Sequence, residues 1–162
     1  MAKTPQEQLR AYLKDAHALE QMSLQMTQTA AKASKDSELR QLFEHHHEET
    51  QEHERLIRQR IEAHGDSTST IKDIGARVAA MAKGMAATLP PDTPGRLVRD
   101  GYVQEHTEIA SYELLERVAT QAGDSETADV ARRIRENERE TAEKLAGAWD
   151  RAAQLSLSTA PG

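Results

Sequence analysis

The chain contains no cysteine, and only 3% of its 162 residues are aromatic. Without cysteine it cannot form disulfides, thiol nucleophiles, iron–sulfur clusters or zinc fingers, and the composition fits a reducing compartment. No apolar run approaches the ~20 residues of a transmembrane helix, and the first residues, MAKTPQEQ, have no apolar signal core. We therefore expect a cytoplasmic protein that does not interact with membranes.

A basic segment is also missing. The chain has 27 acidic and 21 basic residues, which gives a formal net charge of −6. Such a chain is poorly suited to binding the phosphates of nucleic acids, and we expect no nucleic-acid partner. The residues that are abundant, Ala, Glu, Gln, Arg and Leu, are typical of long helices. The length fits a single domain.

Start and stop signals divide the chain into five predicted helices. Thr4, Pro5 and Glu7 form a helix-start motif, and Gly65 and Gly123 are suited to the position just after a helix end. The predicted helices span residues 5–33, 37–64, 71–88, 94–122 and 125–155, within one domain of residues 1–155 and before a flexible tail of residues 156–162. No segment alternates like a strand for long enough to form a sheet. We predict an all-α fold, a four-helix bundle of two antiparallel hairpins with an additional crossover helix.

At least one glutamate interrupts the apolar stripe of each long predicted helix. Positions that face a bundle core recur every three or four residues. In the second helix they are Leu39, Leu42, His46, Glu49, His53 and Leu56; the other stripes contain Glu20, then Glu105 with Glu108, and then Glu138. Because an unpaired carboxylate in a core is very costly, each glutamate predicts a nearby cation, proton or water molecule.

Counting from the turns places four of these glutamates at one height. Glu20 and Glu49 are equidistant from the first turn, and Glu108 and Glu138 are equidistant from Gly123 in the second. Each lies about 15 residues, or roughly 22 Å, from its turn, near the middle of a helix of about 42 Å. If the crossover helix spans the bundle, the four carboxylates meet at mid-height. With one or two histidines, this is the arrangement of di-metal carboxylate bundles.

Each residue also has a simpler interpretation. A glutamate on a predicted stripe can be partly exposed instead of buried. His46 is also compatible with a hydrogen-bonded core histidine, and His53 with a donor between helices. Tyr112 fits a core aromatic whose hydroxyl binds a carboxylate better than a radical site. Since four depths agree, we favour the metal site and include His46 and Tyr112 as additional candidates.

Several segments resemble the bacterial YciE/YciF-type ferritin-like proteins. They are YLKDAHALEQ, FEHHHEETQEHERL, EHTEIASYELLERVA and RENERETAEKL, and the resemblance extends from about Gln6 to Ala153. It implies a ferritin-like bundle with a crossover helix and a di-metal centre, in a family associated with stress responses and often dimeric. We accordingly expect a homodimer. The resemblance implies metal ligands at Glu20, Glu49, Glu105, Glu108 and Glu138, with His53 following Glu49.

The chain departs from the usual ferritin-like ligand pattern, in which Glu-x-x-His occurs on the second and fourth bundle helices. Glu49 is preceded by His46 and followed by His53, but at different spacings from that motif. Glu138 is followed by Thr141 and by no histidine. We therefore predict an unequal centre that binds one metal ion tightly and a second one weakly.

Hard oxygen ligands with few imidazoles suit iron or manganese better than a structural zinc ion. We expect two metal ions, with iron first and manganese or zinc as alternatives. Glu49 and Glu138 are the predicted bridging carboxylates, and Glu20, Glu105 or Glu108 the terminal ones.

The first functional hypothesis is a di-iron oxidoreductase, ferroxidase-like or rubrerythrin-like, that consumes O₂ or peroxide. Without cysteine the chain has no rubredoxin-type electron donor, so electrons come from Fe²⁺ itself or from a separate protein. The alternatives are a non-catalytic metal-binding stress protein and a helical interaction module.

Overall fold

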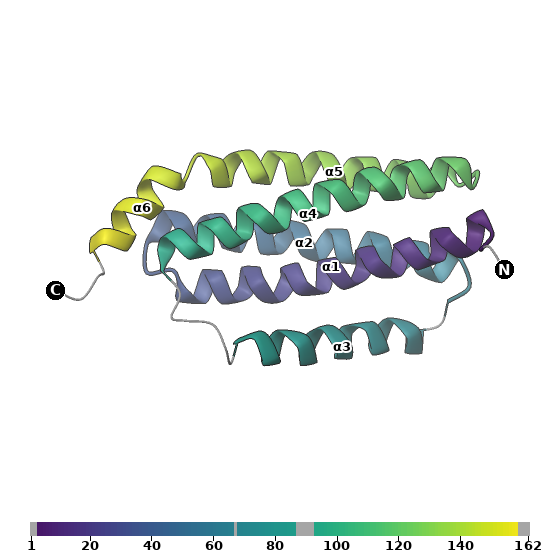
Figure 1. Ribbon diagram of the computed structural model, residues 1–162, viewed down its shortest axis with the longest axis horizontal. Helices are drawn as coiled ribbons and strands as arrows, with labels where there is room; N and C mark the ends of the chain where they lie inside the picture. The colour runs from purple at the N-terminus through teal and green to yellow at the C-terminus, as the bar shows by residue number, and fades with distance from the viewer. Residues whose placement is uncertain (1–2, 67, 87–92, 159–162) are drawn as a thin grey trace.

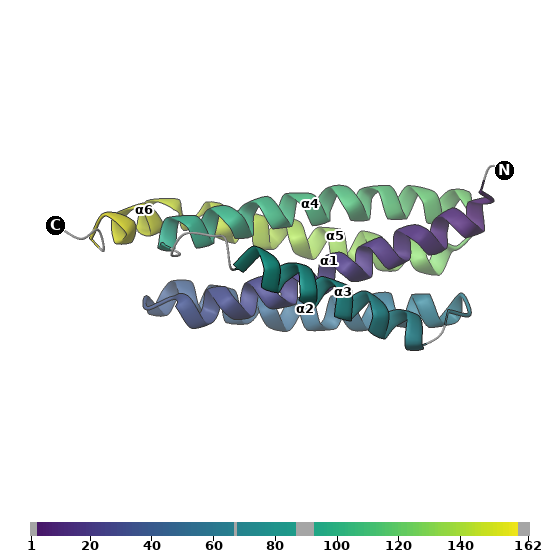
Figure 2. The same ribbon diagram turned by 60° about the horizontal axis from the view of Figure 1, so that its bottom comes forward.

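The computed structural model describes residues 3–66, 68–86 and 93–158, and these ranges contain six α-helices. They are α1 (Pro5–Ala33), α2 (Ser37–Ala63), α3 (Thr68–Ala86), α4 (Pro94–Gln121), α5 (Ser125–Ala146) and α6 (Trp149–Ser158). Helices α1, α2, α4 and α5 run side by side along the long axis, and α3 lies outside them against α1 (Figure 1, Figure 2). The predicted all-α bundle with a crossover helix is confirmed. No helix within the described ranges is both long and apolar enough to cross a membrane.

The bundle consists of two antiparallel hairpins, α1 with α2 and α4 with α5, and these two pairs make the most extensive helix contacts. Helix α3 runs back along the bundle before α4 begins, so the α1–α2 turn and the α4–α5 turn lie at opposite ends of the molecule (Figure 1). This geometry is the condition under which the middles of all four long helices meet at one height.

Two glycines end helices in the way their sequence positions predict. Gly65 and Gly123 have φ angles of +81° and +76°, a region that residues with a Cβ rarely adopt. After each glycine the next amide turns back into the helix: the N–H of Asp66 donates to the Ile61 carbonyl at 3.3 Å, and that of Asp124 donates to the Ala119 carbonyl at 2.9 Å. These bonds satisfy carbonyls that a helix end would otherwise leave unpaired.

The last predicted helix, residues 125–155, is divided in two. Helix α5 ends at Ala146, with Gly147 as its cap, and α6 begins at Trp149. Glycine is a weak helix former, and the break lets α6 bend so that Ala152 joins the apolar core. Helix α6 continues to Ser158, into the predicted tail. The rest of that tail, residues 159–162, lies outside the described residues, as do residues 87–88 at the end of the third predicted helix.

The core consists of two apolar clusters with buried polar side chains between them. The first apolar cluster, toward the α4–α5 turn, contains Leu9, Leu13, Ala16, Ile57, Ile61, Ile71, Tyr112, Leu115, Ala119, Ala128, Ala131 and Ile134. The second, toward the α1–α2 turn, contains Ala30, Leu39, Phe43, Leu97, Val98, Leu145 and Ala152. The polar layer between them contains His17, Glu20, Ser23, Thr27, His46, Thr50, His53, Gln104, Glu105, Glu108, Glu138 and Thr141.

A charged junction joins the end of α2 to the start of α5. Asp124 caps α5 by accepting a hydrogen bond from the Thr127 N–H at 3.0 Å. It also accepts from Arg60 at 3.2 Å and pairs with His64 at 2.7 Å. Burial opposes the charged form, but the hydrogen bonds from Thr127 and His64 outweigh it and lower the pKa of Asp124.

We expect Asp124→Ala to lower the free energy of unfolding by about 2 kcal/mol, because a lost N-cap costs about 1 kcal/mol and two charged hydrogen bonds to α2 are lost with it. Urea unfolding measures the change. Asp129→Ala, at an exposed position of α5, is the control and should stay within about 0.5 kcal/mol of wild type. Since the pKa of Asp124 is lowered on folding, its contribution should shrink as the pH falls below the ordinary aspartate value. Equal effects of the two variants would contradict the role of the junction.

Candidate metal centre

Two groups of three side chains in the polar layer are each suited to hold a metal ion. We call them the Glu20 triad (Glu20, His53 and Glu138) and the Glu105 triad (His46, Glu105 and Glu138). Within each triad one ligand atom from every residue lies within 4.8 Å of the others, and all the residues are buried. Glu138 belongs to both triads, so the two candidate sites are adjacent.

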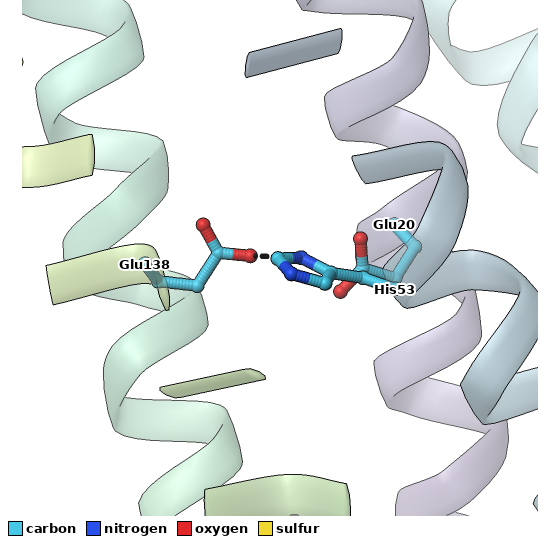
Figure 3. A group of neighbouring side chains, drawn as sticks. All are labelled: Glu20, His53 and Glu138. Atoms are coloured by element: carbon cyan, nitrogen blue, oxygen red, sulfur yellow. Dashed lines mark hydrogen bonds and ion pairs between the residues drawn. The ribbon is translucent and has the colours of Figure 1, made fainter. Parts of the chain in front are cut away.

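The helices position these ligands through simple periodicity. His46 and His53 are seven residues apart on α2, which is about two turns, so both rings face the bundle interior at different heights. Glu20 comes from α1, Glu105 from α4 and Glu138 from α5. In Figure 3, Glu138 reaches across the bundle toward the ring of His53, and the Glu20 carboxylate lies beside that residue. All four long helices therefore contribute to the centre.

The Glu20 triad is partly held in place by hydrogen bonds. His53 Nδ1 lies 2.8 Å from Glu138 Oε1, and the Tyr112 hydroxyl donates a short hydrogen bond to Glu20 Oε1. The second oxygen of each carboxylate, Oε2 of Glu20 and Oε2 of Glu138, has no hydrogen-bond partner among the described residues. One oxygen of each carboxylate is thus fixed by the protein, and the other is free to bind a cation.

The side chains of the Glu105 triad have fewer hydrogen-bond partners than those of the Glu20 triad. His46 Nε2 lies 2.8 Å from Glu105 Oε1, but the two atoms are not aligned for a hydrogen bond. Within the described ranges, neither ring nitrogen of His46 and neither oxygen of Glu105 has a hydrogen-bond partner. A cation between them would use atoms that the protein leaves unpaired.

Burial controls the charge of the carboxylates. It raises the pKa of Glu20 to about 8 and, together with the neighbouring Glu138, raises the pKa of Glu105 to about 12. Burial and the charges of Glu20 and Glu138 also raise the pKa of Glu108 well above its ordinary value. Without a cation, Glu105 is therefore neutral at pH 7, and the same causes favour the neutral form of Glu108.

The pKa values of the two histidines are shifted in opposite directions. Burial lowers the pKa of His46, which favours the neutral ring that can bind a metal ion. Burial has the same effect on His53, but the hydrogen bond and charge of Glu138 outweigh it and raise the pKa of His53. Glu138 in turn has a lowered pKa, because the hydrogen bond and the charge of His53 outweigh its burial. The pairing of His53 with Glu138, which favours the charged form of each, lies at the centre of the metal-free layer.

The unpaired polar atoms test whether a metal ion fits this layer. The large majority of buried side-chain polar atoms in folded proteins are hydrogen-bonded. Of the nine buried side-chain atoms that lack a partner in the described part of the chain, seven belong to Glu20, His46, Glu105, Glu108 and Glu138. Their concentration in one layer, and a donor set of carboxylate oxygens with two imidazoles, fit a divalent metal ion.

The structure brings together four of the residues predicted as ligands, Glu20, His53, Glu105 and Glu138, and adds His46 to them. Two other candidates lie beside the triads and belong to neither. Glu108 is fully buried and accepts a hydrogen bond from Gln104 at 3.0 Å. Tyr112 is held on Glu20, as the interpretation of a core aromatic bonded to a carboxylate predicts.

The predicted inward position of Glu49 is not observed. Its side chain is 22% exposed, it belongs to neither triad, and Thr50 is buried in its place. Both the predicted and the observed stripes of α2 step by three and four residues, but the predicted one stepped three residues from His46 to Glu49, whereas the observed one steps four, to Thr50. The buried positions of α2 are Leu39, Phe43, His46, Thr50, His53, Ile57 and Ile61. Glu138 is therefore the one predicted bridging carboxylate that the triads share.

Thr50 and Gln104 are among the buried polar residues of the layer that were not identified from the sequence. Thr50 lies four residues after His46 and three before His53, so a helical stripe through the two histidines would have indicated it. Gln104 precedes Glu105 and lies one turn before Glu108, a spacing at which glutamine and glutamate side chains pair on a helix.

A four-helix bundle with a crossover helix and carboxylates at mid-height defines a ferritin-like protein. Residues 4–158 match the family described as "Domain of unknown function (DUF892)", and the chain belongs to this family.

Two solved structures share the fold over nearly their whole length. A protein from Xanthomonas campestris pv. campestris is 27% identical, with a TM-score of 0.77 over 96% of this chain and 97% of that one. The Escherichia coli stress protein YciF is 24% identical, with a TM-score of 0.76 over 94% of this chain and 99% of that one. The resemblance to YciE/YciF-type proteins predicted from the sequence is confirmed.

Proposed function

We propose that this protein is a ferritin-like di-metal protein that binds two divalent ions, with iron first and manganese or zinc as alternatives. One ion would be held by the Glu20 triad and the other by the Glu105 triad, with Glu138 between them. The observation that carries the proposal is the concentration of unpaired buried oxygens and imidazole nitrogens in the polar layer. A helical interaction module would gain nothing from these atoms, because each one destabilises a core that lacks a cation.

We further propose that the protein oxidises Fe²⁺ with peroxide or O₂, with iron as the substrate. Two Fe²⁺ ions supply two electrons, and these, with two protons, reduce peroxide to two water molecules or O₂ to peroxide. Glu108 is suited to hold a proton, because it is fully buried, its pKa is raised well above the ordinary value, and its Oε2 has no partner within the described ranges. Tyr112 fixes one oxygen of Glu20 and leaves the other available to the ion.

A non-catalytic metal-binding protein is the second candidate function. The depth of the centre favours it, since Glu20, Glu105 and Glu138 are 0% exposed and a small oxidant must cross the bundle surface to reach them. In that case the metal ions mainly stabilise a bundle with a polar core. Oxidation measurements distinguish the two functions.

Three related expectations are part of the same proposal. The E. coli relative is described as a stress protein, and we propose a stress-related role in the cytoplasm for this chain as well. Electrons beyond those of Fe²⁺ would come from a separate protein. We also propose a homodimer, supported by two large apolar side chains on the outer face of α4, Val103 at 58% and Leu114 at 43% exposure.

The proposed function predicts that chelator-treated protein binds two Fe²⁺ per chain under anaerobic conditions, measured by titration and elemental analysis. Addition of peroxide or air should then produce ferric absorbance at least about tenfold faster than the same iron without protein, a change of about 1.4 kcal/mol in the barrier. Glu44→Gln, at an exposed position on α2, is the control and should bind and oxidise iron as wild type does. Less than one ion per chain would contradict the metal centre. Two ions without accelerated oxidation would favour the non-catalytic function.

A further inference from the structure

Glu49 lies at the boundary between the polar layer and solvent, and its carboxylate has neighbours on both sides. On the outer side, His45 Nε2 is 3.2 Å and Lys144 Nζ is 3.6 Å from Glu49 Oε1, and the His45 side chain is 56% exposed. On the inner side, the buried Thr141 hydroxyl donates a hydrogen bond to Glu49 Oε2 at 3.1 Å. Thr141 thus fixes a carboxylate that remains accessible from solvent.

His46 connects this carboxylate to the centre. Its Nδ1 lies 4.0 Å from Glu49 Oε2, and its Nε2 lies 2.8 Å from Glu105 Oε1. The side chain is buried, and neither ring nitrogen has a hydrogen-bond partner within the described ranges. A buried ring with an unpaired nitrogen on each side indicates a ligand on each side, because buried polar atoms are otherwise paired.

We propose that Glu49, His45 and Nδ1 of His46 form a loading site, where a divalent transition-metal ion is captured from solvent before it passes to the Glu105 triad. The inference rests on the proposed metal centre and gives Glu49 a transient role in place of resident ligation. One carboxylate with two imidazoles is a donor set that iron, manganese and zinc ions all accept.

Lys144 and the Glu105 triad account for capture and release. The Lys144 ammonium group lies beside the Glu49 carboxylate and balances its negative charge. An arriving divalent ion carries twice the charge of this ammonium group and can displace it. The exposed pair itself contributes little stability, so its displacement costs little. The ion then moves inward because the Glu105 triad offers two buried carboxylates. Once the ion displaces the carboxyl proton of Glu105, attraction between opposite charges is stronger in the interior than at the surface.

The test is the rate at which metal-free protein takes up Co²⁺, followed by visible absorbance after rapid mixing, together with the final number of ions bound. We expect Glu49→Gln to slow uptake at least about tenfold and His45→Ala about threefold, with wild-type occupancy at equilibrium in both. Lys144→Gln should accelerate uptake about threefold at low salt, because the competing cation is removed. Glu48→Gln, the neighbouring exposed glutamate, is the matched control and should change neither rate nor occupancy.

The outcomes separate the loading site from the metal centre. Lower equilibrium occupancy in Glu49→Gln would make Glu49 a resident ligand and overturn the loading site while leaving the metal centre intact. An uptake rate equal to that of Glu48→Gln would also overturn it. Wild-type protein that binds no Co²⁺ would overturn the metal centre itself, and the loading site with it. Normal occupancy with slow uptake supports both proposals.

Discussion

Glu138→Ala should abolish the binding of both metal ions, because Glu138 is the residue that the two triads share. Without it, each site keeps one carboxylate and one imidazole, too few ligands to hold an ion against water. Glu20→Ala, by contrast, removes a ligand from the Glu20 triad alone and should reduce binding from two ions to one. Elemental analysis after metal loading and desalting measures the stoichiometry directly.

Folding must be separated from ligation in this experiment. Removal of Glu138 takes away the partner of buried His53, and breaking a buried ion pair costs about 3–5 kcal/mol when the remaining charge persists. Glu138→Gln is the matched variant, because the amide keeps the shape of the side chain and an acceptor for His53 but loses the charge. Circular dichroism should show a folded bundle for Glu138→Gln, with at most one weakly bound ion. One tightly bound ion in Glu138→Ala would contradict the shared role.

Metal-free protein should become less stable as the pH rises from about 5 to about 8. Glu20 has an ordinary pKa of 4.5 and a pKa of about 8 in the folded protein, so over this interval the folded state binds a proton that the unfolded chain has released. Stability then falls with pH, by up to about 1.4 kcal/mol per unit for each such group. Glu105 and Glu108, whose pKa values are also raised, act in the same direction. His53 adds to the loss above its unfolded pKa, because its own pKa is raised.

Thermal unfolding at pH 5.5, 7 and 8.5 measures this effect, and we expect the melting temperature to fall by at least about 10 °C across the series. The metal-loaded protein should show the opposite trend, because ions compete with protons for the carboxylates and bind more tightly as the pH rises. Glu20→Gln removes one titrating group and should make the metal-free dependence shallower. A melting temperature that rises with pH in metal-free protein would contradict the assignment of neutral buried carboxylates.

The sequence was sufficient to predict the bundle and the height of the centre. Helix ends were marked by local signals such as Thr4 and Gly123, whose geometry depends on a few neighbouring residues. The height followed from counting along helices of fixed rise, which tolerates an error of one residue. The direction in which a side chain points does not tolerate that error, since one residue rotates it by about 100°.

Glu49 and Thr50 illustrate this limit. They are adjacent on α2, and only the packing of the whole bundle decides which of them faces inward. The same packing brings His46 against Glu105 from another helix, a contact that no spacing within α2 encodes. The break at Gly147 was similarly hidden, because it depends on where the apolar face of α6 finds a place to pack.

The division of the core into two apolar clusters separated by a polar layer has a consequence for metal affinity. Each ligand-bearing helix is anchored by close-packed side chains on both sides of the layer, so the ligand backbones are fixed before an ion arrives. The entropy of ordering them is lost during folding and not during binding, which is the condition for preorganised recognition. The ends of the bundle thus stabilise the fold, and the middle is left free to hold charges that no isolated helix could bring together.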